Sequence, residues 1–180
     1  MRRNDREVKD FDDIVGIIKR CDVCRLALNG GDGYPYILPL NFGFTATPGA
    51  APINNVASCN AKGEKADSKI TLYFHGATEG KKYELIKKDN RASFEMDCAH
   101  RLVTDNVAGN CTMEYESVIG RGTIEIVDDN DTAAKIEALD ILMAQYPVPA
   151  DFKYNVNIVA RTTVMKMTVT EFTAKRRMKR

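Results

Sequence analysis

The segment over residues 34–44 is the feature that most restricts how this chain can fold. Large apolar side chains recur along it at a period of two, which is the spacing of one face of a β-strand: Tyr34, Tyr36, Leu38, Leu40, Phe42 and Phe44. Pro35 and Pro39 occupy the other face, and proline has no backbone N–H to donate to a neighbouring strand. We therefore predict an irregular strand that lies at a sheet edge or contains a bulge.

Elsewhere the sequence predicts short strands bounded by turn residues. A turn over residues 30–33 joins residues 25–28 to the alternating segment as a β-hairpin. Gly120 is predicted to form a tight connection between two later strands. The further strands are expected at residues 70–75, 91–98, 111–119, 121–127 and 157–172.

Helices are fewer than strands in this prediction. The first begins at a capping box formed by Asn4 and Glu7, and the second is capped by Thr78. Apolar residues at helical spacing predict helices over residues 4–21, 79–88 and 131–146.

These elements indicate a mainly β fold with peripheral α-helices. Helices this sparse do not supply regular βαβ units, so we expect a mostly antiparallel barrel with helices packed outside it. The glycine-rich signatures of dinucleotide-binding and P-loop proteins are absent from the sequence. A length of 180 residues predicts one domain over residues 1–180, with a loop insertion at 45–69 and a frayed basic tail at 175–180.

The charge balance excludes several kinds of partner. Lys and Arg number 26 against 25 Asp and Glu, for a net charge of +1, so we expect neither nucleic acid nor membrane as a partner. No apolar run approaches the ~20 residues that span a bilayer. The first residues carry no apolar stretch typical of a secretory signal, so a cytoplasmic location is expected.

The five cysteines are an odd number without regular spacing, which predicts free thiols rather than a disulfide framework. Cys21 and Cys24 match the C-x-x-C spacing of redox pairs and of half a zinc site. The sequence offers no second pair of ligands, and the motif ends a helix instead of following a strand. We therefore predict no metal site.

A candidate anion site lies where the strand at residues 70–75 passes through a glycine-containing turn into the second helix. Lys81 and Lys82 fall in the first turn of that helix, where unpaired N–H groups already favour a phosphate. The alternative is that both lysines lie on a solvated helix face, and their spacing leaves both interpretations open.

Three blocks of the sequence carry a resemblance to a known family. They are residues 36–44, residues 72–77 with Gly80-Lys81-Lys82, and residues 115–122. In this order they resemble the pyridoxamine 5'-phosphate oxidase-like FMN-binding split barrels, and more narrowly the 5-nitroimidazole resistance proteins. The resemblance implies a Greek-key-like split barrel and a homodimer with FMN between the protomers.

The resemblance also assigns residues to the FMN site. It implies that Lys81 and Lys82 bind the phosphate, that Glu116 and Ser117 line the flavin, and that His75 is the catalytic residue and lies near the flavin. The backbone expected to follow the flavin ring is that of Pro39, Leu40, Asn41 and Phe42. The residues alone leave open a structural role for His75 at the end of its strand.

The leading functional hypothesis is an FMN-dependent reductase of a small molecule, with a 5-nitroimidazole reduced to its amine as the family-level example. A histidine with a pKa near neutrality could pass protons to the reduced nitro group. The alternatives are a pyridoxamine phosphate oxidase-like enzyme and a non-catalytic dimer that binds or sequesters flavin.

Overall fold

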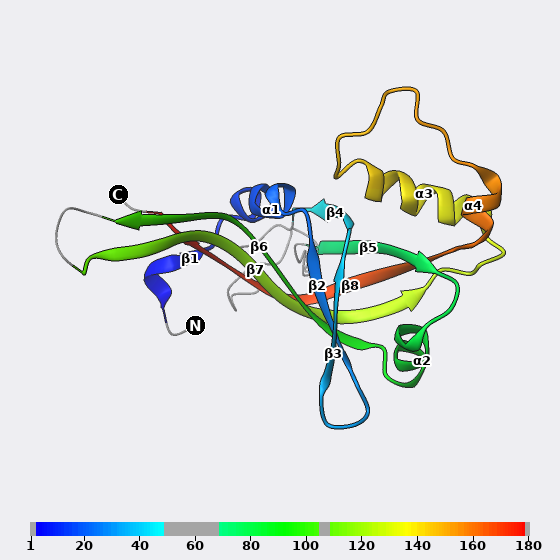
Figure 1. The fold of residues 1–180 in the computed structure, drawn as a ribbon, viewed down its shortest axis with the longest axis horizontal. Helices are drawn as coiled ribbons and strands as arrows, with labels where there is room; N and C mark the ends of the chain where they lie inside the picture. Colours follow the sequence, from blue (N-terminus) through cyan, green and yellow to red (C-terminus); the bar gives the residue numbers. More distant parts are fainter. Residues whose placement is uncertain (1–2, 49–68, 105–108, 179–180) are drawn as a thin grey trace, which may run out of the picture.

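The computed structural model describes residues 3–48, 69–104 and 109–178. Its strands form one antiparallel sheet in the order β3-β2-β6-β7-β8-β5-β4, and β1 pairs with β8 (Figure 1). The strands are β1 (Glu7–Val8), β2 (Cys24–Asn29), β3 (Pro35–Leu40), β4 (Gly43–Thr47), β5 (Lys69–Ala77), β6 (Arg91–Thr104), β7 (Cys111–Ile126) and β8 (Thr162–Arg177).

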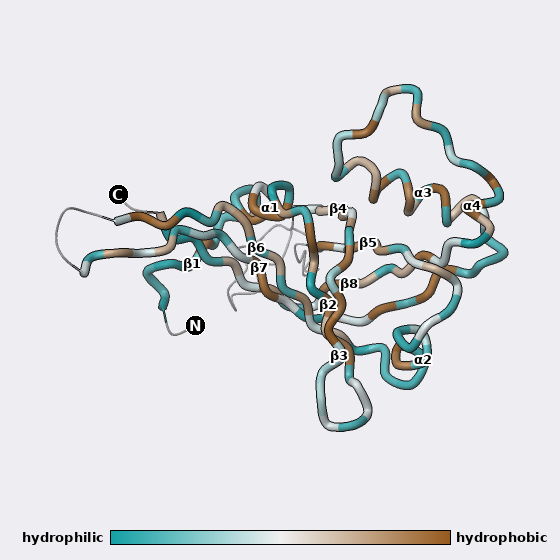
Figure 2. Tube along the Cα trace, in the orientation of Figure 1, coloured by the Kyte–Doolittle hydropathy of each residue, from teal (hydrophilic) through white to brown (hydrophobic). Residues whose placement is uncertain are grey.

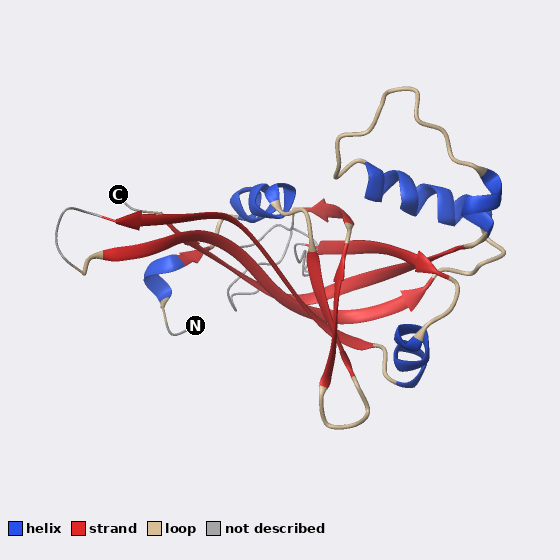
Figure 3. Ribbon diagram, viewed as in Figure 1, coloured by secondary structure: helices blue, strands red, loops and turns tan. Residues whose placement is uncertain are grey.

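The helices lie around this sheet (Figure 3). They are a 3₁₀ turn η1 (Asn4–Arg6), α1 (Phe11–Arg20), α2 (Lys81–Lys88), α3 (Thr132–Met143) and α4 (Val156–Ala160). The predicted mainly β class with peripheral helices is therefore confirmed.

β3 lies at the end of the strand order, so the predicted edge position of the proline-containing strand is confirmed. Pro35 and Pro39 are exposed, whereas Tyr36, Leu38 and Leu40 are partly buried on the other face. The strand ends at Leu40, however, and β4 starts again at Gly43.

The strand breaks there because helix α3 packs directly on Gly43. A Cβ at that position would lie 2.3 Å from the Cα of Leu142. The predicted strand over residues 34–44 is therefore two strands joined at Asn41 and Phe42. This close approach requires a glycine.

The predicted tight connection at Gly120 is wrong, because β7 runs without interruption through it. A Cβ on Gly120 would lie 2.5 Å from the ring of Phe94, and one on Gly122 would lie 2.0 Å from the carbonyl oxygen of Thr168. The pairing of β7 with β8 shifts register between Arg121 and Gly122. These glycines therefore permit close strand packing at a bulge rather than a turn.

Both predicted helix starts of the N-terminal half are also wrong. Asp10, not Asn4, is the N-cap of α1, and its carboxylate accepts from the N–H of Asp13 at 2.9 Å. Glu7 belongs to β1, which pairs with β8, so it does not form a capping box with Asn4. The second helix starts at Lys81, and its N-cap is Gly80 rather than Thr78. Gly80 has a φ of 136°, which glycine adopts readily.

The C-terminal strand differs from the prediction at both ends. Residues 156–160 form α4, capped by the side chain of Asn155, and β8 begins only at Thr162. β8 continues to Arg177 and pairs with β7, so residues 175–177 are not a frayed tail. Residues 49–68 of the predicted insertion lie outside the described residues.

The main apolar core lies between the sheet and helices α1 and α2. Ile14, Ile17 and Ile18 of α1 pack on sheet residues such as Leu26 and Phe74. Figure 2 shows α1 with a mixed pattern along its turns, as expected for a helix with one buried face. A smaller cluster under α3 includes Ala138, Leu139, Val159 and Val164.

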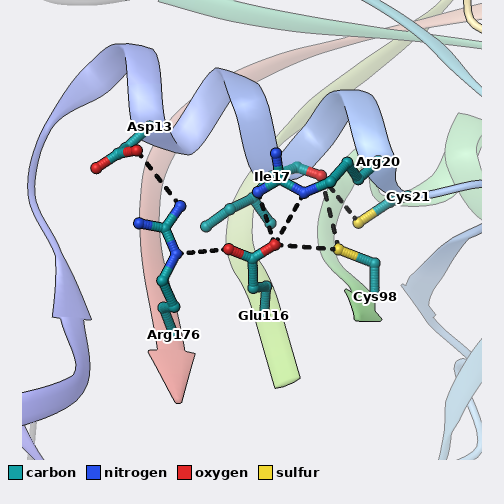
Figure 4. Close-up of polar contacts among 7 residues, drawn as sticks. All are labelled: Asp13, Ile17, Arg20, Cys21, Cys98, Glu116 and Arg176. Carbon is teal, nitrogen blue, oxygen red and sulfur yellow. Dashed lines mark hydrogen bonds and ion pairs between the residues drawn. The ribbon is translucent and has the colours of Figure 1, made fainter. Parts of the chain in front are cut away.

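One carboxylate is buried at the edge of the main core. Glu116 of β7 accepts from Arg20 of α1 at 2.6 Å and from Arg176 of β8 at 2.5 Å (Figure 4). Burial works to raise the pKa of Glu116, but the hydrogen bonds from both guanidinium groups outweigh it, so its pKa is lowered. This carboxylate therefore connects α1 to the sheet through its hydrogen bond with Arg20.

Replacing Glu116 with glutamine should therefore lower the free energy of unfolding by about 2–3 kcal/mol at pH 7, because charge-assisted hydrogen bonds are lost in a buried place. Since the pKa is lowered in the folded state, the carboxylate stabilises the fold above its unfolded pKa. That stabilisation is lost as the pH falls through the folded value. In denaturant titrations, the free energy of unfolding of the Glu116→Gln variant should be lower than that of the wild type at pH 7, and the two should agree at acid pH.

The control is Glu171→Gln, which removes a carboxylate from an exposed pair with Arg121. Exposed ion pairs contribute little to stability, so this variant should stay close to the wild type. Equal losses in the two variants would contradict a special role for Glu116.

Candidate functional site

The turn between β5 and α2 brings a lysine back against the sheet. A Cβ on Gly76 would lie 2.9 Å from Nζ of Lys82 and 3.0 Å from the hydroxyl oxygen of Tyr83. The Tyr83 hydroxyl also donates to the carbonyl oxygen of Ala77 at 2.5 Å. Glycine at position 76 therefore makes room for the ammonium group, and Tyr83 fixes the turn.

The positive charges at this turn have aromatic neighbours instead of acidic ones. Nζ of Lys82 lies 4.4 Å from the centre of the Tyr83 ring, and Nζ of Lys81 lies 5.1 Å from that of Tyr36. Within the described ranges, no carboxylate forms an ion pair with either lysine. Burial lowers the pKa of Lys82 because it disfavours the charged form.

The beginning of α2 adds further positive character. Its N-cap, Gly80, has no side chain to accept from the first N–H groups of the helix, which therefore stay available to a ligand. Lys82 is partly buried whereas Lys81 is exposed, so the alternative of a solvated helix face describes Lys81 better than Lys82. This arrangement can hold a phosphate or another compact anion.

His75 lies at the same end of β5, where its ring is accessible to solvent. Partial desolvation of the imidazole is the larger cause that lowers its pKa, and the positive charge of Lys82 lowers it further. At pH 7 the ring is therefore mainly neutral. An anion that compensates the charge of Lys82 would favour its protonation.

The segment Pro39–Phe42 passes the same end of β5. The backbone N–H of Phe42 donates to the hydroxyl of Tyr146 at 2.9 Å, and that hydroxyl donates to the carbonyl oxygen of Asp22. β4 pairs with β5 from Gly43, which lies opposite Tyr73. The structure thus brings His75 close to the lysine-bearing turn, and β3 reaches the same turn through Tyr36, whose ring lies 5.1 Å from Nζ of Lys81.

Glu116 and Ser117 lie elsewhere in the chain. Glu116 pairs with Arg176 of β8, whereas His75 pairs with Val164 of the same strand. These two positions on β8 are twelve residues apart, which corresponds to about 40 Å of extended strand. Within one chain, the predicted site residues therefore form two separate groups.

The polar network around Asp129 was not predicted from the sequence. Asp129 accepts from Nζ of Lys135 at 3.2 Å and from the hydroxyl of Thr163 at 3.3 Å. Burial raises the pKa of the Tyr83 phenol, and the charge of Asp129 raises it further. Lys135 is only 1% exposed. The sequence did contain a signal, because Lys135 shares a helical face with Ala138, Leu139 and Leu142.

Other candidate features are less informative. The described part of the chain holds no group of three His, Cys, Asp or Glu side chains that could bind a metal ion. His100 is exposed and pairs with Asp97 at 2.8 Å, as expected for a surface histidine. Among the helices that are described, none has the length and apolar character required to cross a membrane.

Comparison with known proteins identifies the family. The sequence model of the pyridoxamine 5'-phosphate oxidase family matches residues 10–176. The chain therefore belongs to the pyridoxamine 5'-phosphate oxidase family, and its fold is the mainly β split barrel that the sequence predicted. A search of curated proteins found no match.

Solved structures share this fold over nearly the whole chain. A candidate 5-nitroimidazole antibiotic resistance protein from Bacteroides thetaiotaomicron is 28% identical, with a TM-score of 0.70, and the match covers 94% of this chain and 85% of that one. The flavocytochrome Anf3 from Azotobacter vinelandii is 17% identical, with a TM-score of 0.70 and coverage of 99% and 72%. An FAD- and heme-binding protein from Mycobacterium smegmatis is 15% identical, with a TM-score of 0.63 and coverage of 95% and 73%.

The coupling between Lys82 and His75 can be tested by replacing Lys82 with methionine. Removal of the neighbouring positive charge favours the imidazolium, so the pKa of His75 should rise toward the ordinary value of about 6.5. An NMR titration of the imidazole Cε1–H signal measures this change. His100 supplies the reference signal, because the sequence contains only two histidines.

Lys87→Met is the matched control, since Lys87 lies in the last turn of the same helix. It should leave the titration of His75 as in the wild type. A pKa of His75 that stays constant or falls in the Lys82 variant would show that this lysine does not act on the ring.

Proposed function

We propose that the chain binds FMN and that Lys81, Lys82 and the first turn of α2 hold its phosphate. The observation that carries this proposal is the partly buried ammonium of Lys82, which is seated over Gly76 without an acidic partner in the described residues. The names of two structural neighbours, the flavocytochrome and the FAD- and heme-binding protein, support a flavin as the ligand.

The residues around this turn fit a flavin in further ways. The segment Pro39–Phe42 follows Tyr36, which contacts Lys81, and in it Pro39 and Asn41 are exposed while Phe42 anchors the segment in the core. A phosphate monoester at the lysines and a flat ring along this backbone would occupy one continuous surface. We propose these residues as the cofactor-binding group of one chain.

We further propose a homodimer in which a second copy supplies Glu116 and Ser117. The separation of the two groups along β8 means that one chain alone does not complete the predicted site. The outer part of the β6–β7 ribbon also exposes the cross-strand pair Leu102 and Met113, together with Ile119 nearer the barrel. Apolar side chains exposed on such a ribbon are suited to an interface between copies.

The activity that we propose is the reduction of small acceptors such as 5-nitroimidazoles to their amines. The name of the neighbour from Bacteroides thetaiotaomicron supports this substrate class. Bound FMN would supply the electrons after its reduction by an external donor. His75 would hold a proton on its ring and deliver it to the acceptor, because a phosphate beside Lys82 removes part of the repulsion that keeps the ring neutral.

The phosphate assignment predicts a loss that depends on the ligand. Lys81→Ala combined with Lys82→Ala should weaken FMN binding at least about a hundredfold, because each charge-assisted bond contributes ~1.5–3 kcal/mol. Riboflavin has the same ring without the phosphate, so its affinity should change little. Fluorescence titration of the apoprotein with both ligands measures the difference.

The matched control is Lys87→Ala combined with Lys88→Ala, which removes the same charge from the other end of α2. This control should bind FMN like the wild type. Unchanged FMN binding in the Lys81 and Lys82 variant, or an equal loss for riboflavin, would contradict the phosphate site.

The reductase activity is tested with the loaded protein under anaerobic conditions. Reduced protein in at least threefold excess over a 5-nitroimidazole should regain the oxidised flavin spectrum and yield the amine, because the nitro group takes up six electrons and each reduced FMN supplies two. His75→Ala should slow amine formation at neutral pH while FMN binding persists. Flavin that stays reduced after mixing would instead favour the flavin-sequestering alternative. An unchanged rate of amine formation in the His75→Ala variant would indicate that His75 has only a structural role.

A further inference from the structure

Two cysteines that are distant in sequence meet at the C-terminal end of α1. Cys21 caps this helix, and its thiol donates to the carbonyl oxygen of Ile17 at 3.4 Å. The thiol of Cys98, from β6, lies 3.9 Å from the same oxygen atom. Both sulfur atoms therefore contact one carbonyl oxygen, and each thiol influences the pKa of the other. Figure 4 shows both sulfur atoms on the same side of the helix, beside Glu116.

The backbone pairing agrees with this contact. The pairing of β2 with β6 starts at Arg25 and Glu95, and Cys98 follows Glu95 by three residues while Cys21 precedes β2 by three. The pairing therefore directs both segments to the same end of these strands. Disulfide bonds need two cysteines close together, with Cα atoms usually 4.4–6.8 Å apart.

The pair is therefore not the one that the C-x-x-C spacing suggested. Cys24 starts β2 with its side chain fully buried, and the groups that act on its thiol are Glu95 and Arg25. Cys111 is exposed at the start of β7. Of the four cysteines in the described ranges, Cys21 and Cys98 are the two whose thiols contact the same carbonyl oxygen, that of Ile17.

The surroundings give the two thiols different roles. Cys98 is only partly buried. Burial and the charge of Glu116 raise the pKa of its thiol, while Cys21 and Arg20 lower it in part. Cys21 is 2% exposed, and burial raises the pKa of its thiol far more. Cys98 is thus the thiol that an oxidant from solvent reaches first, and Cys21 is placed behind it.

We propose that Cys21 and Cys98 form a redox-active dithiol site that a peroxide converts to a disulfide. The thiolate of Cys98 attacks one peroxide oxygen, the O–O bond breaks, and with hydrogen peroxide the second oxygen leaves as water after protonation. Cys98 is then a sulfenic acid. The sulfur of Cys21 attacks it, the S–S bond forms, and the S–O bond breaks with loss of a second water. Two thiols are oxidised by two electrons and one peroxide is reduced.

Oxidation would change the contacts of Glu116. The thiol of Cys98 lies 3.8 Å from Oε2 of Glu116, the same oxygen that accepts from Arg20. A disulfide removes both thiol protons, and it joins the end of α1 covalently to β6. The site therefore links the redox state of the chain to the ion pairs that fasten α1.

The test uses the full chain with Cys59 and Cys111 replaced by serine, so that only Cys21, Cys24 and Cys98 remain. The folded protein is treated with hydrogen peroxide, free thiols are blocked with iodoacetamide, and the digest is mapped by mass spectrometry without reduction. The expected product is a single cross-link between the peptides of Cys21 and Cys98, with Cys24 alkylated. The same map on the unaltered chain answers the question if the serine variant does not fold.

Single replacements in this background then assign the roles. Cys24→Ser should form the disulfide at the wild-type rate, whereas Cys98→Ser should abolish it. In Cys21→Ser, the sulfenic acid of Cys98 should persist and be trapped by dimedone. A link between Cys21 and Cys24, three alkylated cysteines after peroxide, or over-oxidation of Cys98 while Cys21 stays free would overturn the proposal.

Discussion

The close contact between Lys82 and Gly76 is the constraint on which the candidate site depends. The ammonium group of Lys82, from α2, lies at the end of β5, 2.9 Å from where a Cβ on Gly76 would be, so a side chain at position 76 would displace it. The ammonium loses part of its hydration there without gaining a carboxylate among the described residues. The field of this charge lowers the pKa of His75, so one packing detail sets the electrostatics of the whole turn.

The two ends of β8 carry different parts of the proposed chemistry. One end lies near the lysine-bearing turn. The other end pairs with β7 at Glu116, and Arg20 and the two cysteines lie close to that carboxylate. Under the proposed dimer, the Glu116 end of one copy completes the flavin site of the other. Cys98 would then lie close to the same cofactor, because its thiol contacts Glu116 directly. A peroxide formed at a reduced flavin would thus arise near the thiol that we propose it oxidises.

The sequence predicted best those features that depend on residues close together in the chain. Period-two alternation with prolines predicted the edge strand β3, which is confirmed, and the lysines after a glycine turn predicted an anion site, which stays a prediction. The errors share another cause: pairing between distant segments overrode local preference. Glu7 joined β8 instead of a capping box, and residues 175–177 joined β7 instead of fraying. The contacts of Asp129 with Lys135 and Thr163 combine a loop, α3 and β8, so the helical face of Lys135 was the one local signal of this network.

The position of His75 makes proton supply depend on what occupies the turn. Without an anion, desolvation and the charge of Lys82 keep the ring mainly neutral at pH 7. A bound phosphate compensates that charge, so anion binding and protonation of His75 favour each other, and by linkage each strengthens the other to the same degree. The histidine would therefore be a better proton donor when the cofactor is present. This coupling requires only that the ammonium of Lys82 lie close enough to the imidazole for their charges to interact.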